Sequence, residues 1–264
     1  MIAVACNADD TMLNDLSYSD FVARMGQANS PPGGAETVGK WVALSGIDAG
    51  CHVLDLACST GYSGRTIAGQ TGCSATGVDI SPTAIDAAKE TAHQLSLGLK
   101  YLCCDACDLP FRDSSFSHSV CGSAFGFFHD RARVLNESCR VLKPGGFLCT
   151  ATFVYDSIPP AALVSKVNDI INGSIDPQSS VKTETAFFSA APLVLAGEDR
   201  FRLPVLSHDE VARSCLHDIS DAQARNRISQ ADAEAALNRH VYCRLVFNEH
   251  RRYQSGLIQI WRHD

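Results

Sequence analysis

Val53-Leu-Asp-Leu-Ala-Cys-Ser-Thr-Gly61 is the stretch that decides the fold class of this 264-residue chain. Together with His52, its first part is a short apolar run that predicts a buried strand over residues 52–56. A loop of small residues follows, and residues 62–70 have the pattern of a helix that begins directly after Gly61. A strand, a tight loop and a helix in this order predict the first unit of a parallel α/β sheet.

The same alternation continues downstream of this stretch. Short apolar runs predict strands over residues 74–79, 99–103, 116–121, 147–153 and 257–261. Ser81 and Pro82 supply the N-cap and first-turn proline of a helix that extends to about residue 97. A helix over residues 130–142 stops at Lys143-Pro-Gly-Gly146, because proline cannot continue it and glycine permits a reversal. We therefore expect an α/β, doubly wound and mostly parallel sheet with helices on both faces.

The chain is expected to divide into four segments. Residues 46–154 form the core, and residues 1–45 form an N-terminal arm with a Pro-Pro-Gly-Gly turn at 31–34 and a helix around 36–44. The alternation stops over residues 155–206, which we interpret as a substrate-side insertion over the carboxyl edge of the sheet. Residues 207–264 then complete the sheet. The arm and the insertion are expected to act as lids, because they flank the edge where ligands of such sheets bind.

Composition excludes several functional classes. A formal net charge of -7 disfavours a nucleic-acid partner, because affinity for phosphates depends on Lys and Arg. No stretch reaches the roughly 20 apolar residues of a membrane span, and the N-terminus lacks a cationic start, so we expect a cytoplasmic protein without a membrane partner. The twelve cysteines lie in apolar runs, which predicts reduced thiols. Cys104 and Cys107 have no second pair at zinc-site spacing, so no metal is expected.

Two cofactors compete for the loop after the first strand. Ser59-Thr-Gly-Tyr-Ser-Gly64 nearly matches the glycine pattern of dinucleotide binders, with Asp79 roughly 20 residues further on, as such sites require. Asp55, however, ends the first strand, where its carboxylate would be poorly placed for a pyrophosphate. A cofactor that carries an ammonium and a sulfonium would instead gain from this charge.

Residues 53–61 resemble the first motif of the class I S-adenosylmethionine-dependent methyltransferases. That motif has an acidic residue followed by three alternating small residues, usually glycines, which here are Ala57, Ser59 and Gly61. Alanine and serine leave room for a close ligand, provided that neither position requires a positive φ. The resemblance implies a Rossmann-like, seven-stranded fold and S-adenosylmethionine as the cofactor.

Three further motifs strengthen the resemblance over about residues 52–153. They are Gly77-Val-Asp-Ile-Ser81, Asp105-Ala-Cys-Asp-Leu-Pro-Phe111 and Arg140-Val-Leu-Lys-Pro-Gly-Gly146. The family's pattern implies that Asp79 accepts hydrogen bonds from the ribose, that Ile80 packs on adenine and that Asp105 accepts the adenine amino group. The cofactor-binding residues expected on this basis are Tyr18, Asp55, Ala57, Cys58, Ser59, Gly61, Asp79, Ile80, Asp105, Ala106 and Ser123.

The exit of the fourth strand is expected to face the transferred methyl group. It reads Gly122-Ser-Ala-Phe-Gly-Phe-Phe-His-Asp130, and we assign Phe125, Phe128 and His129 to the acceptor side. His129 is the candidate general base, because imidazole titrates near neutrality. The alternative is that it only packs or caps the next helix, since many methyl transfers need no more than in-line positioning.

The sequence thus predicts a methyltransferase that moves a methyl group to an O, N or C atom of a small molecule, such as a secondary metabolite. A monomer or a homodimer is expected. Two alternatives stay open at this point: an NAD-linked oxidoreductase, and a cyclase of the same fold that binds the cofactor without transferring methyl.

Overall fold

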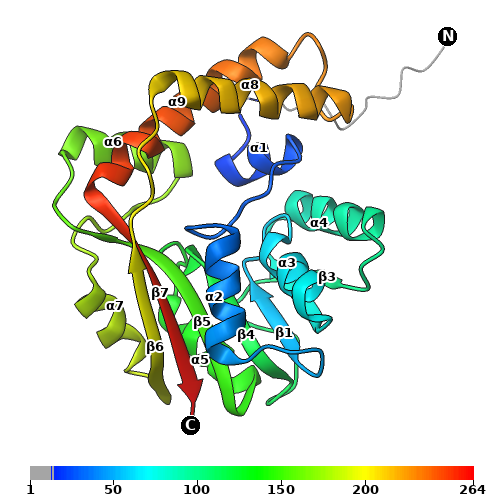
Figure 1. The fold of residues 1–264 in the computed structure, drawn as a ribbon, viewed down its shortest axis with the longest axis vertical. Coiled ribbons are helices and arrows are strands. Elements are labelled where there is room, and N and C mark those ends of the chain that lie inside the picture. Colours follow the sequence, from blue (N-terminus) through cyan, green and yellow to red (C-terminus); the bar gives the residue numbers. More distant parts are fainter. Residues whose placement is uncertain (1–12, 14) are drawn as a thin grey trace.

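The computed structural model describes residue 13 and residues 15–264, and within these residues seven strands form one sheet in the order β3-β2-β1-β4-β5-β7-β6 (Figure 1). The first five strands are parallel, and β7 runs antiparallel between β5 and β6. The order reverses between β1 and β4, which is the point where ligands bind in such sheets. The strands are β1 (His52–Leu56), β2 (Ser74–Asp79), β3 (Lys100–Cys103), β4 (Phe116–Gly122), β5 (Leu142–Tyr155), β6 (Leu193–Phe201) and β7 (Gln254–His263).

Helices cover both faces of this sheet because successive strand residues point to opposite sides. Val53 of β1 packs in a cluster with Trp41 and Ile67, which belong to the helices on one face. Leu54 packs in a second cluster with Val134, on the other face. The helices are α1 (Tyr18–Arg24), α2 (Ala35–Ser45), α3 (Tyr62–Thr71), α4 (Pro82–Gln94), α5 (Arg131–Val141), α6 (Ala161–Ile171), α7 (Val181–Phe188), α8 (His208–Ala224) and α9 (Ala233–His250), with short 3-10 turns at η1 (Ala124–Gly126) and η2 (Arg251–Tyr253).

The expected core is confirmed closely. Strands β1 and β2 begin and end where the apolar runs predict, and α3 and α5 differ from expectation by a residue at most. Ser81 caps α4 as predicted, since its Oγ accepts a hydrogen bond from the Ala84 amide at 3.1 Å, and Pro82 occupies the first turn. The Rossmann-like, seven-stranded fold expected from the sequence is the one observed.

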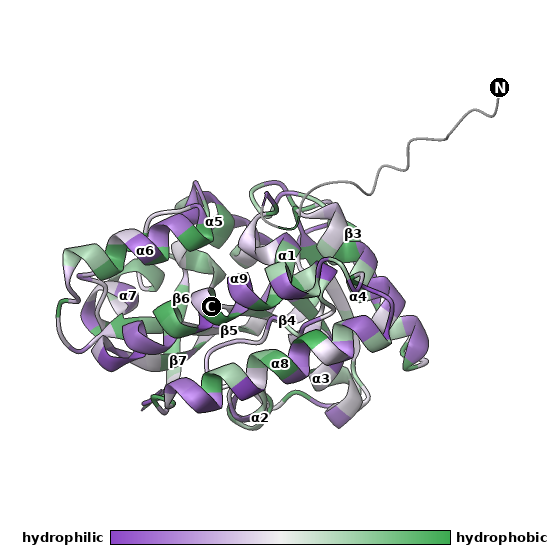
Figure 2. Cartoon of the chain, turned by 90° about the horizontal axis from the view of Figure 1, so that it is seen from above, coloured by the Kyte–Doolittle hydropathy of each residue, from purple (hydrophilic) through white to green (hydrophobic). Residues whose placement is uncertain are grey.

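Helices α1, α8 and α9 form a cap over the carboxyl ends of the parallel strands (Figure 1). Its interior joins Phe21 and Met25, from the N-terminal arm, with Ile219 of α8 and Ala236 of α9. Viewed from above, α8 carries both hydrophilic and hydrophobic residues along its length, as surface helices do (Figure 2). The two ends of the chain therefore build the cap together.

The two segments expected after the core contain more than the sequence indicated. Residues 155–206 are not only an insertion, because they include the edge strand β6, which pairs with β7. An edge strand has one neighbour, and Glu198, Asp199 and Arg200 break the apolar pattern that would have identified it. Residues 207–264 add one strand to the sheet, and most of them form α8 and α9.

Helices α8 and α9 were not predicted, because the face that they bury is partly polar. His240 of α9 is buried and lies 2.8 Å from Asp218 of α8, so a hydrogen-bonded pair occupies a position where an apolar residue would mark the helix. The arm residues 1–12 and 14, which the expected N-terminal segment included, lie outside the described residues. None of the helices in the described part of the chain is long and apolar enough to cross a membrane.

Candidate functional site

The loop after β1 has alternating left-handed residues. Ala57 has φ 48°, Ser59 has φ 47° and Gly61 has φ 75°. Alanine and serine were expected to fit at positions 57 and 59 only if neither position had a positive φ. Both positions have one, so this condition is not met. Such a conformation costs an L-residue about 1–2 kcal/mol. The chain keeps the strained loop without the glycines that would relax it, which is typical of functional loops.

Two aspartates fix this loop from below. Asp79 accepts hydrogen bonds from the Ser59 amide at 2.8 Å and from the Ser81 amide at 2.9 Å, one on each carboxylate oxygen. Asp55 accepts from the Gly64 amide at 2.8 Å and is 2% exposed. Burial raises the pKa of Asp55 to about 7. Asp79 is only half-buried, so its remaining lone pairs stay accessible to the hydroxyls of a ligand.

Asp55 differs from its expected role. We expected its carboxylate to face the positive charges of a cofactor, but it lies beneath the loop and holds the first turn of α3. A Cβ atom on Gly64 would lie 3.2 Å from the Asp55 carboxylate, so the helix approaches this group closely.

The remaining cofactor candidates stand at the neighbouring strand ends. Ile80, directly after β2, is 72% exposed, which is unusual for a large apolar side chain. Asp105, after β3, accepts a hydrogen bond from the Cys107 amide at 2.8 Å, and this bond holds its pKa below the usual value. Cys58 and Ala106 are buried beneath these positions, and burial raises the pKa of the Cys58 thiol, so it remains neutral.

Two serine hydroxyls point to a ligand at this edge. Within the described residues, Ser59 Oγ and Ser123 Oγ are buried and have no hydrogen-bond partner. Ser123 also has φ 64° and follows β4. Seven buried side-chain polar atoms of the described residues lack a partner, and these two are the ones that lie in the loops directly after β1 and β4, where a polar ligand would supply their partners. The residues present therefore fit a cofactor laid across the ends of β1 and β4.

The N-terminal arm closes over the same edge. Thr60 Oγ1 donates to the Gln27 carbonyl at 3.2 Å and accepts from the Asn29 amide at 3.4 Å. A Cβ atom on Gly122 would lie 2.8 Å from Pro31 Cβ, so the arm passes directly over the exit of β4. Residues 27–31 are thus in contact with the loop, as a lid in the closed position would be.

Tyr18 lies in the cap, packed against α9. Its ring meets Phe247 of α9 edge-on at 5.2 Å, and burial raises its pKa to about 12. Asp20, in the same turn of α1, accepts a hydrogen bond from Ser81 at 2.7 Å. Helix α1 therefore connects the end of β2 with α9.

The aromatic loop after β4 is arranged differently from expectation. Phe125 is 4% exposed and packs edge-on against Phe188 of α7 at 5.0 Å and against Phe128 at 5.6 Å. Phe125 belongs to the core cluster and Phe128 packs against it, so in this structure both rings contact the core, and their assignment to the acceptor side stays a prediction. Phe127, which the sequence analysis did not select, is 55% exposed.

His129 lies near the loop after β3. Its Nε2 is 3.8 Å from Cys107 Sγ, and the donor atoms of Asp105, Cys107 and His129 all lie within 4.8 Å of one another. Burial raises the pKa of Cys107, so the thiol is protonated near pH 7 when no metal is bound. Asp130, the next residue, caps α5 by accepting from the Arg133 amide at 2.9 Å. We assign neither a metal nor a base to this cluster.

Tyr155, the last residue of β5, belongs to a hydrogen-bonded pair that was not predicted from the sequence. Tyr155 Oη lies 3.1 Å from His250 Nε2, at the junction of α9 and β7. Burial lowers the pKa of His250 to about 4 and raises that of Tyr155 to about 12, so both groups are neutral near pH 7. The signal available in the sequence was the position of Tyr155 two residues beyond the strand predicted over residues 147–153.

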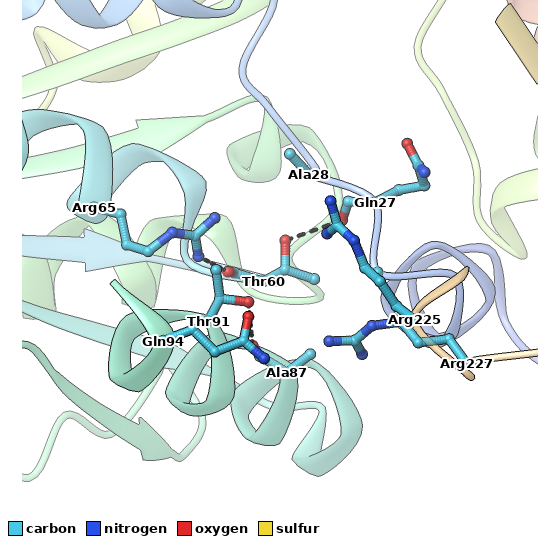
Figure 3. A pocket seen from close by; sticks show the side chains of 10 residues that line it. Gln27, Ala28, Thr60, Arg65, Ala87, Thr91, Gln94, Arg225 and Arg227 are labelled. Carbon is cyan, nitrogen blue, oxygen red and sulfur yellow. Dashed lines mark hydrogen bonds between the residues drawn. The ribbon is translucent and has the colours of Figure 1, made fainter. Parts of the chain in front are cut away.

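A cavity of about 170 Å³ adjoins the loop through Thr60 (Figure 3). Its cationic groups already have partners. Arg227 pairs with Glu90 at 2.9 Å, Arg225 lies 3.8 Å from Asp221, and Arg65 donates to the Thr60 carbonyl. This cavity joins the arm, α4 and the segment after α8, and we assign no ligand to it.

Comparisons with known proteins agree with this geometry. Residues 54–150 match a family model described as a methyltransferase domain. The chain is similar to the crystal structure of the MccD protein, with 34% identity and a TM-score of 0.75, over 89% of this chain and all of that one.

Two curated relatives match over shorter lengths. The O-methyltransferase resE of Aspergillus sclerotiorum is 34% identical over 114 residues, or 42% of this chain and 43% of that protein. The ubiquinone/menaquinone biosynthesis C-methyltransferase UbiE of Pseudoalteromonas translucida is 34% identical over 143 residues, or 52% of this chain and 55% of that protein. The chain thus spans about half the length of these two relatives.

Proposed function

Because the chain belongs to the Rossmann-like, class I family of S-adenosylmethionine-dependent methyltransferases, we propose that it transfers the methyl group of that cofactor to a small-molecule acceptor. Membership in this family favours S-adenosylmethionine over the NAD-linked alternative. The names of the relatives include both O- and C-methyl transfer, so an oxygen or a carbon acceptor atom has direct support among similar proteins.

The observation that carries the proposal is the group of polar atoms left open at the carboxyl edge. Asp79 retains lone pairs for the ribose hydroxyls, and Ile80 offers an exposed apolar surface for adenine. Asp105 stands beyond them to accept an amino group. Ser59 and Ser123 carry the unpaired hydroxyls, at the two strands where the sheet order reverses. This set supports the cofactor roles implied by the family's motifs.

When bound, the cofactor supplies an electrophilic methyl group on a sulfonium, and its loss leaves a neutral thioether. The chain's own contribution is to position the cofactor and the acceptor and to exclude water. The arm at residues 27–31 covers the exit of β4, which limits access of water to that point. In-line placement of the acceptor about 3–3.5 Å from the methyl carbon accounts for a large part of the rate in such reactions.

Proton removal from the acceptor has no assigned base in this proposal. His129 interacts with the loop after β3, and the low pKa of His250 makes it a weak base near pH 7. The Tyr155–His250 pair instead offers a hydroxyl at the end of β5 that can orient an acceptor. We therefore propose catalysis by positioning, with the acid or base chemistry left to solvent or to the acceptor itself.

The experiment combines binding with product analysis. Calorimetry with S-adenosylhomocysteine and, separately, with NAD should give heat of binding for the first ligand alone. Incubation with S-adenosylmethionine and panels of hydroxylated and quinone-type metabolites should then yield S-adenosylhomocysteine and a product heavier by one CH₂ unit. A product of unchanged mass would instead support the cyclase alternative, and binding of NAD alone would reject the proposal.

A further inference from the structure

One face of α9 carries two arginines on either side of an aromatic ring. Arg244, Phe247 and Arg251 are spaced i, i+3 and i+7, which places them on one side of a helix. Arg251 has helical backbone angles, φ -57° and ψ -23°, so it continues this face beyond His250. Since the Phe247 ring meets Tyr18 of α1, the face that bears both arginines is turned toward α1.

Neither guanidinium has a counter-charge among residue 13 and residues 15–264. No hydrogen bond or ion pair involves Arg244 or Arg251 in this part of the chain, although both side chains are partly buried. Neighbouring arginines are partnered: Arg239 donates to the carbonyls of Leu13 and Leu16, and Arg252 pairs with Glu249 at 2.8 Å. Partly buried charges of one sign are unfavourable unless an anion joins them.

Among the described residues, none of the groups that act on the charge of Arg251 is a carboxylate. Burial, and then the like charge of Arg244, hold the pKa of Arg251 below its usual value, and only Tyr18 acts in the opposite direction. The charges of both arginines lower the pKa of Tyr18, so the three groups lie close together. The Tyr18 hydroxyl remains protonated near pH 7, so it does not neutralise either charge.

The position of the pair separates it from the expected cofactor cradle. Arg251 precedes β7, whose first residue, Gln254, pairs with Tyr155 at the end of β5. The cradle lies over β3, β2, β1 and β4, and the order β4-β5-β7 puts two strand spacings between β4 and β7. At about 4.8 Å per spacing this is roughly 10 Å. The pair therefore lies toward the β5 and β7 side of the sheet's carboxyl edge, where we place the acceptor.

We propose that Arg244 and Arg251 bind one oxyanion of the acceptor, a carboxylate or a phosphate group. Guanidinium groups present paired donors that match these anions, and two of them on one helix face bracket a single anionic group. The inference rests on the proposed methyl transfer and refines its substrate class, since an apolar acceptor would leave both charges unpaired.

The test is calorimetry with inorganic phosphate as the probe, with and without S-adenosylhomocysteine. Arg244→Gln and Arg251→Gln are each expected to weaken phosphate binding about tenfold or more, because charge-assisted hydrogen bonds contribute about 1.5–3 kcal/mol. Arg252→Gln, which removes an adjacent exposed arginine, is the matched control and is expected to leave binding unchanged. Equal phosphate binding by the wild type and the Arg244→Gln/Arg251→Gln double variant would overturn the inference.

A second ligand pair identifies the source of the anion. S-adenosylhomocysteine has a carboxylate that 5′-methylthioadenosine lacks. If Arg251→Gln weakened binding of the first but not of the second, the arginines would hold the cofactor's carboxylate, and the assignment to the acceptor would be wrong. Failure of the wild type to bind S-adenosylhomocysteine would instead reject the proposed function, while the phosphate titration would still report on the pair.

Thermal unfolding separates a ligand-binding role from a structural one. Without anion, Arg251→Gln is expected to match or exceed the wild type in melting temperature, because it removes a partly buried, unpaired charge. Added phosphate should raise the melting temperature of the wild type and not that of the variant. A variant destabilised equally with and without phosphate would show that Arg251 only stabilises the cap.

Discussion

Replacing Ala57 by glycine should stabilise the protein, although the same change usually destabilises. Ala57 has φ 48° in the loop after β1, where a side chain costs about 1–2 kcal/mol. Glycine removes this strain, but it also increases the conformational entropy of the unfolded chain. That increase lowers the free energy of unfolding by about 0.5–1 kcal/mol. The net gain is about 0.5–1 kcal/mol, or a rise in melting temperature of roughly 1–4 °C for a chain of this size.

The assay is thermal and urea unfolding of Ala57→Gly, Ser59→Gly and the double variant. Ser59→Gly should gain at least as much, since Ser59 Oγ has no partner among the described residues and its removal breaks no bond. Ala43→Gly is the control, because Ala43 is exposed in α2 and glycine there should cost about 1 kcal/mol. Destabilisation of Ala57→Gly by as much as the control would refute the strained geometry of the loop.

Other predictions concern the aspartates and the aromatic loop. Asp79→Asn should weaken S-adenosylhomocysteine binding by about 1–3 kcal/mol in calorimetry, because the charge that strengthens the ribose hydrogen bonds is lost; unchanged affinity in a folded variant would reject the ribose assignment. The pKa of Asp55 is raised to about 7, so its contribution to stability is full below about pH 4 and is lost as the pH rises through 7. Asp55→Asn should therefore reduce the loss of melting temperature between pH 5 and pH 8, and an unaltered pH profile would contradict the buried acid. Phe125→Ala should lower unfolding free energy by about 3–5 kcal/mol, as expected of a buried aromatic residue, whereas a loss of activity at full stability would return Phe125 to the acceptor site.

The core of the fold followed from the sequence because its signals are local. Strands β1 and β2 are buried on both faces, so their apolar runs begin and end with the strands themselves. The cap of α4 also depends on adjacent residues, Ser81 and Pro82. The cofactor candidates at the strand ends were found for the same reason, since their places follow from strand order and loop position.

Features that depend on tertiary contacts were not predictable in this way. Strand β6 is defined by its pairing with β7, about sixty residues away, and its charged residues conceal it. Phe125 was taken for an acceptor residue because the sequence does not show that Phe188 covers it. The positive φ of Ala57 and Ser59 contradicts what their residue types suggest, as functional loops often do.

A crystal structure with S-adenosylhomocysteine would show whether the cofactor lies across the ends of β1, β2 and β4. Both ribose hydroxyls should lie within hydrogen-bond distance of Asp79, the adenine ring should cover Ile80, and Ser59 or Ser123 should gain a partner for its hydroxyl. The sulfur should face a space that leads toward β5 and the Arg244–Arg251 pair. A ligand bound away from the ends of β1, β2 and β4, or one whose ribose does not contact Asp79, would contradict the account.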